Sequence, residues 1–391
     1  MKTAIVIGAG PAGLMAAQAL VDAGLRVTIA DAMPSVGRKF LMAGKSGLNI
    51  TKDVDQATFL SSYQPCPASL KAALSAFGPE AVKSWARDLG QEIFTGTTGR
   101  VFPKVMKASP LLRAMLARLG AQSVTILTRH RWMGWDADAH RFQTPEGMVT
   151  FTADVTVLAL GGASWSRLGS DGEWAKHLPD ITPFAPSNAG VTIDWSPFMA
   201  KHFGKPMKAV TLQAGPITSR GEWIISQHGM EGGGVYNLTP ALREGHALTI
   251  DLLPDWSEAK IRTALERPRG KASFSNHLRK VLRLDPARLA LLYECLNPLP
   301  KDLAAAIKQI KLPVTGLRPI DEAISTVGGV AWSSLDDSLM LTQRPGVFCA
   351  GEMLDWDAPT GGFLINGCLA TGLFAGREAA EFAQKDLCED G

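Results

Sequence analysis

The sequence predicts an α/β protein in which both ends of the chain build one Rossmann-like domain. A strand, a glycine-rich turn, a helix and a second strand follow one another within the first 31 residues. A second glycine-rich turn lies near the other end, and the middle changes to short β-like runs and then to a helical pattern. The expected domains are a discontinuous dinucleotide-binding domain (1–186 and 327–391), an inserted antiparallel, barrel-like β domain (187–254 and 313–326) and a nested helical domain (255–312).

Composition places the chain among globular proteins of two or three domains. Its 391 residues exceed one ordinary core, and 46% hydrophobic with 20% charged residues disfavours disorder. The net charge of +3 is too small to make nucleic acid the default partner, so we do not expect one. No run reaches the roughly 18 apolar residues of a membrane span, and the first residues lack a signal-peptide layout. We expect a cytoplasmic protein with a small-molecule substrate.

The first turn is a candidate diphosphate site. It reads Gly8, Ala9, Gly10, Pro11, Ala12 and Gly13, between a predicted strand over residues 3–7 and a helical run over 14–20. Gly8 permits the tight turn, Gly10 lets the backbone approach a pyrophosphate, and Gly13 allows the helix to pack closely on the strand. The N-terminus of the helix adds amide donors and a positive dipole for the phosphates.

The second predicted strand, residues 26–30, ends at Asp31, with Ala32 beside it. An acid at the tip of this strand is placed to accept hydrogen bonds from an adenosine ribose. The carboxylate also disfavours a nucleotide that carries a 2′-phosphate. An isolated GxGxxG motif is weak, but here the strand, glycines, helix, second strand and acid occur in order. This order predicts a dinucleotide site.

The late segment selects FAD over NAD. An apolar strand near residues 338–350 leads into Gly351 and Glu352, and residues 359–366 then open a helix expected over 367–380. Because the flavin lies far from the adenosine, FAD needs a second glycine–acid turn for its ribityl-phosphate part. It also benefits from a helix N-terminus that stabilises negative charge on the reduced ring. We therefore expect noncovalently bound FAD.

Further motifs resemble those of flavoproteins with the glutathione-reductase-type FAD fold. They are residues 37–51, 326–330 and 350–355 together with 360–362. More narrowly, the chain resembles a bacterial family, the dehydro-bile-acid reductase-like flavoproteins, whose members are linked to the reduction of unsaturated oxo-steroids. Two positions depart from the family pattern, because Leu48 replaces a cysteine and Phe363-Leu364 replaces an aromatic–Asn pair. The resemblance therefore supports FAD binding more than substrate handling.

The resemblance also implies which residues contact FAD. The diphosphate and flavin would be lined by Arg38, Lys39, Ser46, Gly47, Asn49 and Thr51, and the ribityl chain and ring by Gly351, Glu352, Gly362, Phe363, Leu364 and Ile365. A backbone contact to adenine would fall at Arg131 and Trp132. On chemistry alone, the guanidinium of Arg38 suits a diphosphate. Gly161, a further candidate cofactor-binding residue, turns the chain after a predicted buried strand, residues 155–160, that returns to the nucleotide-binding sheet.

The expected helical domain is strongly basic. Residues 255–312 carry twelve Lys and Arg against six Asp and Glu, a local charge of +6, with helix starts expected at Ser257, Asp285 and Pro300. Two interpretations stay open: an ordinary solvated surface, or a patch that attracts an anionic substrate or electron donor. The β-like runs before it lie at 189–193, 208–213, 222–226 and 247–252.

The cysteines and histidines limit the chemistry. The five cysteines (Cys66, Cys295, Cys349, Cys368 and Cys388) form no CxxC pair. We therefore expect reduced thiols, no redox disulfide and no metal site. His228 lies in a loop, residues 226–232, that resembles a family loop and is the candidate proton donor, with a structural or exposed histidine as the alternative.

The prediction for function is an FAD-dependent oxidoreductase that passes hydride from flavin N5 to an activated, enone-like C=C bond of a small organic substrate. NADH or NADPH would be a transient donor, since the sequence shows no second strand–glycine–helix unit. Two alternatives stay open. One is a flavin-dependent dehydrogenase or oxidase working in the oxidative direction, and the other is a non-catalytic flavin-binding or nucleic-acid-associated protein.

Overall fold

The structure is a computed structural model that describes residues 1–389, with side chains described through Lys385. The chain forms two compact units, one made of Met1–Ala185 with the chain from Ser325 onward and the other of Pro186–Ile324. Each unit has a hydrophobic core of its own.

The first unit is built on a five-stranded parallel sheet in the order β22-β10-β1-β2-β6. The strands are β1 (Thr3–Ile7), β2 (Arg26–Ala30), β6 (Thr125–Leu127), β10 (Val155–Leu158) and β22 (Val347–Cys349). In the middle of the sheet Val6 pairs with Ile29 on one side and Val157 on the other, and all three are fully buried. Such apolar runs are typical of parallel sheets covered on both faces. Strands β1 and β2 match the predicted strands residue for residue.

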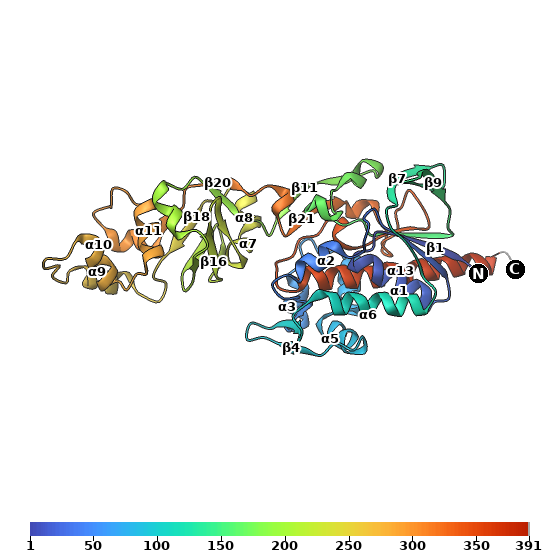
Figure 1. The fold of residues 1–391 in the computed structure, drawn as a ribbon, viewed down its shortest axis with the longest axis horizontal. Helices are drawn as coiled ribbons and strands as arrows, with labels where there is room; N and C mark the ends of the chain where they lie inside the picture. The colour runs from blue at the N-terminus through green and yellow to red at the C-terminus, as the bar shows by residue number, and fades with distance from the viewer. Residues whose placement is uncertain (390–391) are drawn as a thin grey trace. The chain divides into compact units, whose positions relative to one another are not determined.

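Two helices from opposite ends of the chain pack together beside this sheet: α1 (Pro11–Asp22) and α13 (Phe363–Glu389) (Figure 1). Glycines make the close approach possible, since a Cβ at Gly372 would lie 2.2 Å from the carbonyl oxygen of Ala12. A Cβ at Gly376 would lie 2.6 Å from the carbonyl oxygen of Ala16. The first and last segments of the chain thus share one hydrophobic core.

The rest of the first unit surrounds the sheet. Its helices are α2 (Arg38–Ala43), α3 (Gln56–Ser61), α4 (Ala68–Ala76), α5 (Pro79–Asp88) and α6 (Ala108–Ala121), with 3-10 turns η1 (Ser166–Leu168), η2 (Glu173–His177), η5 (Trp332–Ser334) and η6 (Gly351–Met353). Its small sheets are β3 (Thr51–Lys52) with β5 (Arg100–Pro103) and β4 (Ile93–Thr95), β7 (Arg131–Asp136) with β8 (Ala139–Thr144) and β9 (Gly147–Phe151), and β11 (Ile181–Ser187) with β21 (Ser325–Val330).

The second unit combines two antiparallel sheets with helices. One sheet is β13 (Pro206–Met207), β16 (Trp223–Ser226), β17 (Gly229–Glu231), β12 (Val191–Ile193) and β20 (Val314–Leu317), and the other is β15 (Ile217–Ser219), β14 (Thr211–Ala214), β18 (Leu248–Asp251) and β19 (Ile310–Lys311). The helices are α7 (Gly233–Tyr236), α8 (Thr239–Arg243), α9 (Glu258–Leu265), α10 (Phe274–Val281), α11 (Pro286–Cys295) and α12 (Leu303–Lys308), with 3-10 turns η3 (Pro197–His202) and η4 (Ile320–Glu322). Strands and helices share one hydrophobic core.

Each of the helices α9 to α12 has an N-cap residue whose side chain accepts a backbone amide of the first turn. The side chains of Ser257 and Asp285 accept backbone amides at the starts of α9 and α11, where sequence reasoning expected helix starts. It missed α10, which Ser273 caps in the same way. The expected start at Pro300 is wrong, because Asp302 caps α12 and the helix begins at Leu303.

The α/β prediction, with a parallel Rossmann-type sheet plus antiparallel sheets and helices, is confirmed. Within residues 1–389 we find no helix of the length and apolar character needed to cross a bilayer.

Candidate cofactor-binding site

The glycines of the first turn have different structural reasons. Gly8 has φ +107°, and a Cβ there would lie 2.2 Å from the carbonyl oxygen of Ala159. A Cβ at Gly13 would lie 1.8 Å from the carbonyl oxygen of Gly8, so both positions are closed by protein packing. A Cβ at Gly10 would meet no heavy atom within 4 Å. Gly10 therefore leaves the turn open to a ligand rather than to another part of the chain.

Helix α1 presents amide donors at this turn. Gly10 is its N-cap, with no side-chain cap, and Pro11 occupies the first position. The first intrahelical bond runs from the Leu14 amide to the Gly10 carbonyl at 3.0 Å, so the amides of Ala12 and Gly13 have no partner inside the helix. Free amides at the positive end of a helix suit a diphosphate.

Asp31 links the first glycine turn to the segment that follows β2. Its two carboxylate oxygens accept the backbone amides of Ala9 and Met33, both at 2.8 Å. Burial raises the pKa of this carboxyl, although the two amide bonds and the charges of Arg38 and Arg131 oppose the rise. Each carboxylate oxygen keeps further lone pairs, so Asp31 can hold the turn and still accept a ribose hydroxyl.

The predicted adenine segment lies beside Asp31. The Asp31 carbonyl accepts the amide of His130 at 2.9 Å, immediately before β7. Arg131 forms an ion pair with Asp171 at 2.7 Å. The indole of Trp132 is buried and donates to His140 at 3.2 Å, so Trp132 can offer a cofactor only its backbone.

Arg38 carries a buried donor that the protein does not use. Its Nε has no hydrogen-bond partner among the described residues, and its only contact of this kind is a 3.4 Å bond from Nη1 to Ser35. Gly37 places it beside the first turn by donating its amide to the Ala9 carbonyl at 3.0 Å. An orphaned guanidinium donor next to a phosphate-type turn fits a diphosphate.

Lys39 and Glu352 form an ion pair at 2.8 Å, although they are 313 residues apart in sequence. Their side chains are only 26% and 14% exposed. Lys39 also donates to Ser164 at 2.9 Å, and the second oxygen of Glu352 accepts the amide of Thr326 at 3.1 Å. The pair therefore joins α2, the 161–170 segment, β21 and η6.

Sequence reasoning missed Ser164 and Thr326 as members of this cluster, and it also missed Ser170. Ser170 donates to the carbonyl of Gly162 at 3.0 Å and lies 3.5 Å from the Lys39 ammonium. The predicted Gly161 lies beside it, with φ +74° and its carbonyl bound by the indole of Trp174 at 2.9 Å. Thr326 stood in one of the motifs that carry the family resemblance, which was the available signal.

Gly351 lies against the first turn. A Cβ at Gly351 would lie 2.8 Å from the Cβ of Ala12, at the N-terminus of α1. Its amide donates to the Thr371 hydroxyl at 3.0 Å, and its carbonyl accepts the Trp356 indole at 2.9 Å. The two glycine turns that the sequence places at opposite ends are therefore neighbours.

The Gly361–Gly362 turn is held in place by a buried hydrogen-bond network. A Cβ at Gly362 would lie 2.4 Å from the carbonyl carbon of Thr51. The Thr51 hydroxyl donates to Asn366 at 2.6 Å, and Asn366 donates to the carbonyl of Phe77 at 2.8 Å. Because the Thr51 side chain is fully buried and hydrogen-bonded, its contribution is to position the turn.

The start of α13 offers amides rather than side chains. Phe363 is buried against Phe59, and its carbonyl accepts the Tyr63 hydroxyl at 2.7 Å. The first intrahelical bond runs from Asn366 to Gly362, which leaves the amides of Phe363, Leu364 and Ile365 without an intrahelical partner. These amides suit the negative edge of a reduced flavin.

Asn49 and Arg100 border the same turn. From a Cβ position at Gly361, the amide nitrogen of Asn49 lies 4.0 Å away and Nε of Arg100 lies 3.6 Å away. The Asn49 side-chain oxygen is buried without a hydrogen-bond partner among the described residues. Sequence reasoning predicted Asn49 and missed the exposed Arg100, which reaches the turn from β5.

The remaining predicted residues of this region differ in burial. Ser46 is exposed, and Gly47 has φ +123°. Leu48, which departs from the family pattern, is fully buried in the hydrophobic core. It therefore acts as a packing residue in this chain.

His228 belongs to the second unit. It occupies the exposed turn between β16 and β17 in the second unit, whereas all the predicted cofactor residues belong to the first unit. Its backbone carbonyl accepts the amide of Ile193 at 3.0 Å. Its assignment as proton donor stays a proposal.

The described cysteines (Cys66, Cys295, Cys349 and Cys368) are free thiols, and the side chain of Cys388 lies outside the described residues. Burial raises the pKa of Cys295 and of Cys368 to about 12 in each case, which suppresses the reactive thiolate. Among the side chains that the structure describes, through Lys385, no group of His, Cys, Asp and Glu is arranged to hold a metal ion.

The donors and acceptors of this site fit FAD: open amides at two helix starts, an acid that can accept from the ribose, and buried polar atoms, the Nε donor of Arg38 and the Oδ1 acceptor of Asn49, that have no partner among the described residues. Fold and site define an FAD-binding flavoprotein of the oxidoreductase class. The chain belongs to the family described as "HI0933-like protein Rossmann domain", which matches residues 2–378.

Two known proteins with similar sequences have names that differ in substrate. The 3-dehydro-bile acid delta(4,6)-reductase of Clostridium scindens is 26% identical over 96% of this chain and 98% of its own length. The ribosomal RNA dihydrouridine synthase of Escherichia coli is 25% identical over 92% of this chain and 93% of its own. A solved 3-ketosteroid-delta4-(5alpha)-dehydrogenase from Rhodococcus jostii has a TM-score of 0.49 and 14% identity, covering 98% of this chain and 96% of that one.

Proposed function

We propose that the protein is an FAD-dependent reductase of carbon–carbon double bonds conjugated to a carbonyl group. The proposal rests on the chemistry shared by the reactions that the names of the Clostridium scindens and Escherichia coli relatives describe. A 3-oxo group beside a Δ4 double bond is an enone, and the C5=C6 bond of uracil, which dihydrouridine lacks, is conjugated to the C4 carbonyl. Both names describe addition of hydride and a proton across the same functional group.

Bound FAD would supply the hydride, and the chain's own residues would hold and orient it. We assign the diphosphate to the α1 amides and Arg38, and the adenosine ribose to Asp31. The Lys39–Glu352 pair would fix the ribityl region, because it joins four segments of the unit in one network. The amides at the start of α13 would stabilise the reduced ring.

The source of the proton is proposed as His228, because its imidazole can carry an N–H proton and lies in an exposed turn. If His228 is the donor, His228→Gln slows substrate reduction by about 100-fold or more while reduction of the flavin is unchanged. An unchanged rate of substrate reduction would assign the proton to another group.

NADH or NADPH is proposed as the electron donor, binding transiently. Within residues 1–389, the Gly232–Gly234 run follows the antiparallel strand β17 and leads only into the four-residue helix α7. This arrangement does not make a second dinucleotide turn. A donor would therefore use the flavin site itself.

A second candidate function is reduction of the double bond of a uracil ring in RNA. It is favoured by the uneven charge of the chain, with +6 on residues 255–312 and −3 on the remainder, which the net charge of +3 conceals. Our expectation that nucleic acid is not a partner rested on that net value. The uracil ring would then be the reduced group, as the name of the Escherichia coli relative states for that protein.

Stopped-flow mixing of the photoreduced, anaerobic protein with a 3-oxo-Δ4 steroid, a uridine-containing RNA or oxygen tests the proposal. We expect one of the first two to reoxidise the flavin faster than oxygen does, with formation of the saturated product. Rapid reoxidation by oxygen without any response to either unsaturated compound would refute it and favour an oxidase.

A further inference from the structure

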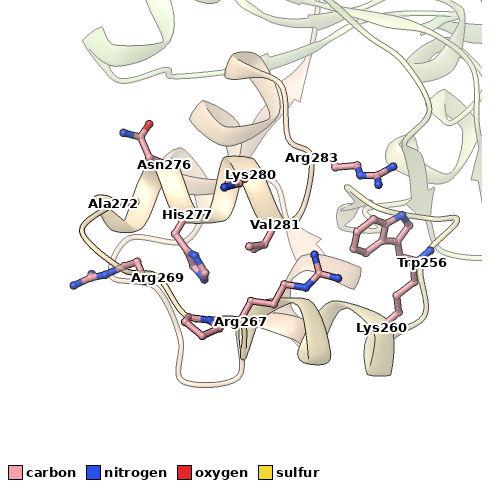
Figure 2. A pocket seen from close by; sticks show the side chains of 11 residues that line it. Trp256, Lys260, Arg267, Arg269, Ala272, Asn276, His277, Lys280, Val281 and Arg283 are labelled. Carbon is pink, nitrogen blue, oxygen red and sulfur yellow. The ribbon is translucent and has the colours of Figure 1, made fainter.

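We propose that a basic cavity in the second unit binds the phosphate backbone of single-stranded RNA. The basic cavity is defined by Trp256, Lys260, Arg267, Arg269, Lys280 and Arg283 and has a volume of about 480 Å³ (Figure 2). It lies wholly within Pro186–Ile324. It is distinct from the candidate cofactor residues, all of which belong to the first unit.

The local sequence brings these cations together. Lys260 lies on the first turn of α9, Arg267 and Arg269 lie in the connection to α10, and Lys280 and Arg283 lie at the other end of α10. Helix α10 buries His277, Leu278 and Val281, which anchors its basic end to the rest of the unit. Figure 2 shows the Arg267 guanidinium extending between α10 on one side and Trp256 with Lys260 on the other.

The charges of the cavity are not neutralised by the protein. None of its five Lys and Arg side chains forms an ion pair with any side chain described through Lys385, and no acidic residue lines the cavity. Arg262, also on α9, shows the contrast, because it pairs with Glu258 at 2.6 Å and Asp302 at 2.9 Å. Five unpaired cations around one concavity repel each other, and a bound polyanion would relieve that repulsion.

The composition of the cavity favours RNA over other anions. Three of the five cations are arginines, whose planar guanidinium binds phosphate oxygens in pairs. Trp256 is half-buried and provides an aromatic ring, with the Lys260 ammonium 4.4 Å from its centroid. Cations beside an aromatic ring are the arrangement by which proteins bind single-stranded nucleic acid, through phosphates and stacked bases. An acidic peptide would use the cations but not the ring.

This inference rests on the RNA form of the proposed function for its biological meaning, but its test needs no turnover. The probe is a short, fluorescently labelled, uridine-containing single-stranded RNA, titrated with the full-length FAD-loaded protein while anisotropy is recorded. If the cavity holds about three phosphates, raising the salt from about 50 to 200 mM weakens binding about 20-fold.

The variant Arg267→Gln/Lys280→Gln removes two of the cations, both on exposed side chains. At about 100 mM salt it should bind about 25-fold more weakly, and its log–log salt slope should be smaller by about 1.4. The control Lys201→Gln/Lys205→Gln removes the same charge from exposed side chains of the same unit outside the cavity, and it should stay within about twofold of the unchanged protein.

Three results would overturn the inference. They are no binding of the RNA, an equal loss in the control variant, and displacement of the RNA by polyglutamate or inorganic phosphate at the same concentration of anionic groups. RNA binding without reduction of uridine would refute the RNA substrate and leave the cavity assignment standing. Reduction of a steroid enone without RNA binding would refute the cavity assignment and leave the proposed enone reduction standing.

Discussion

A substitution at Gly10 tests cofactor binding without disturbing the packing of the protein. Replacing it with alanine adds a methyl group that meets no protein atom within 4 Å, on a backbone with φ −83° that any residue can adopt. The same change at Gly13 would place the methyl carbon 1.8 Å from the Gly8 carbonyl oxygen. Gly10→Ala should therefore leave the protein folded and act on the cofactor alone.

The magnitude follows from these two environments. Without a clash, Gly10→Ala changes the free energy of unfolding of the flavin-free protein by less than about 1 kcal/mol, and in the stabilising direction if the unfolded chain loses freedom. A methyl group forced against a bound diphosphate costs about 1–3 kcal/mol, which weakens FAD binding about 5- to 150-fold. Gly13→Ala should instead destabilise the fold itself.

Two measurements test this on flavin-free protein: urea unfolding for stability and FAD titration by flavin fluorescence for affinity. Gly120→Ala is the matched control, because its methyl group also meets no atom within 4 Å and it lies in α6, away from the site. Normal FAD affinity in Gly10→Ala would refute our assignment of this turn to the diphosphate. A loss of stability comparable to that of Gly13→Ala would refute the packing argument.

Further predictions concern the charged groups of the first unit. Asp31→Ala should cost about 1–3 kcal/mol of stability, because two backbone amides lose their acceptor, and should also weaken FAD binding; an unchanged unfolding curve would contradict this. Lys39→Met should destabilise by about 2 kcal/mol by leaving Glu352 unpaired, and Lys39→Met/Glu352→Gln by less than the two single changes added together, as measured by a double-mutant cycle. Burial and, less strongly, the charge of Arg344 lower the pKa of His140 from 6.5 to about 4, so the folded state resists protonation. The stability that neutral His140 contributes is fully present above about pH 6.5 and falls by about 3 kcal/mol as the pH drops towards 4. Urea unfolding across that pH range should show this fall, and the His140→Gln variant should lose it.

The parts of the fold with local signals could be predicted from sequence. Strands β1 and β2 are apolar runs ended by glycine and acid, and their limits were predicted without error. The capping residues Ser257 and Asp285 likewise marked true helix starts. Helix α10 was missed because it has neither proline at its start nor glycine at its end, and its cap, Ser273, lies in a serine-containing run that also suits a loop.

The site could be predicted only where residues carry their own motif. Ser164 reaches Lys39 across 125 residues of sequence, and such a contact depends on the assembled sheet rather than on a local pattern. Arg100 approaches the Gly361–Gly362 turn for the same reason. Thr51 stood in a specific motif, but nothing in its spacing showed that its hydroxyl turns inward to Asn366. Motifs thus indicated the segments of the candidate site, while the contacts of Ser164, Arg100 and Thr51 follow from the packing of the whole unit.

The absorption spectrum of the purified protein, recorded before and after denaturation, tests the central claim that the two chain ends form one FAD site. We predict flavin bands, one FAD per chain and complete release of the flavin on denaturation. A protein without flavin bands, or one that releases FMN or keeps its flavin covalently attached, would contradict the account.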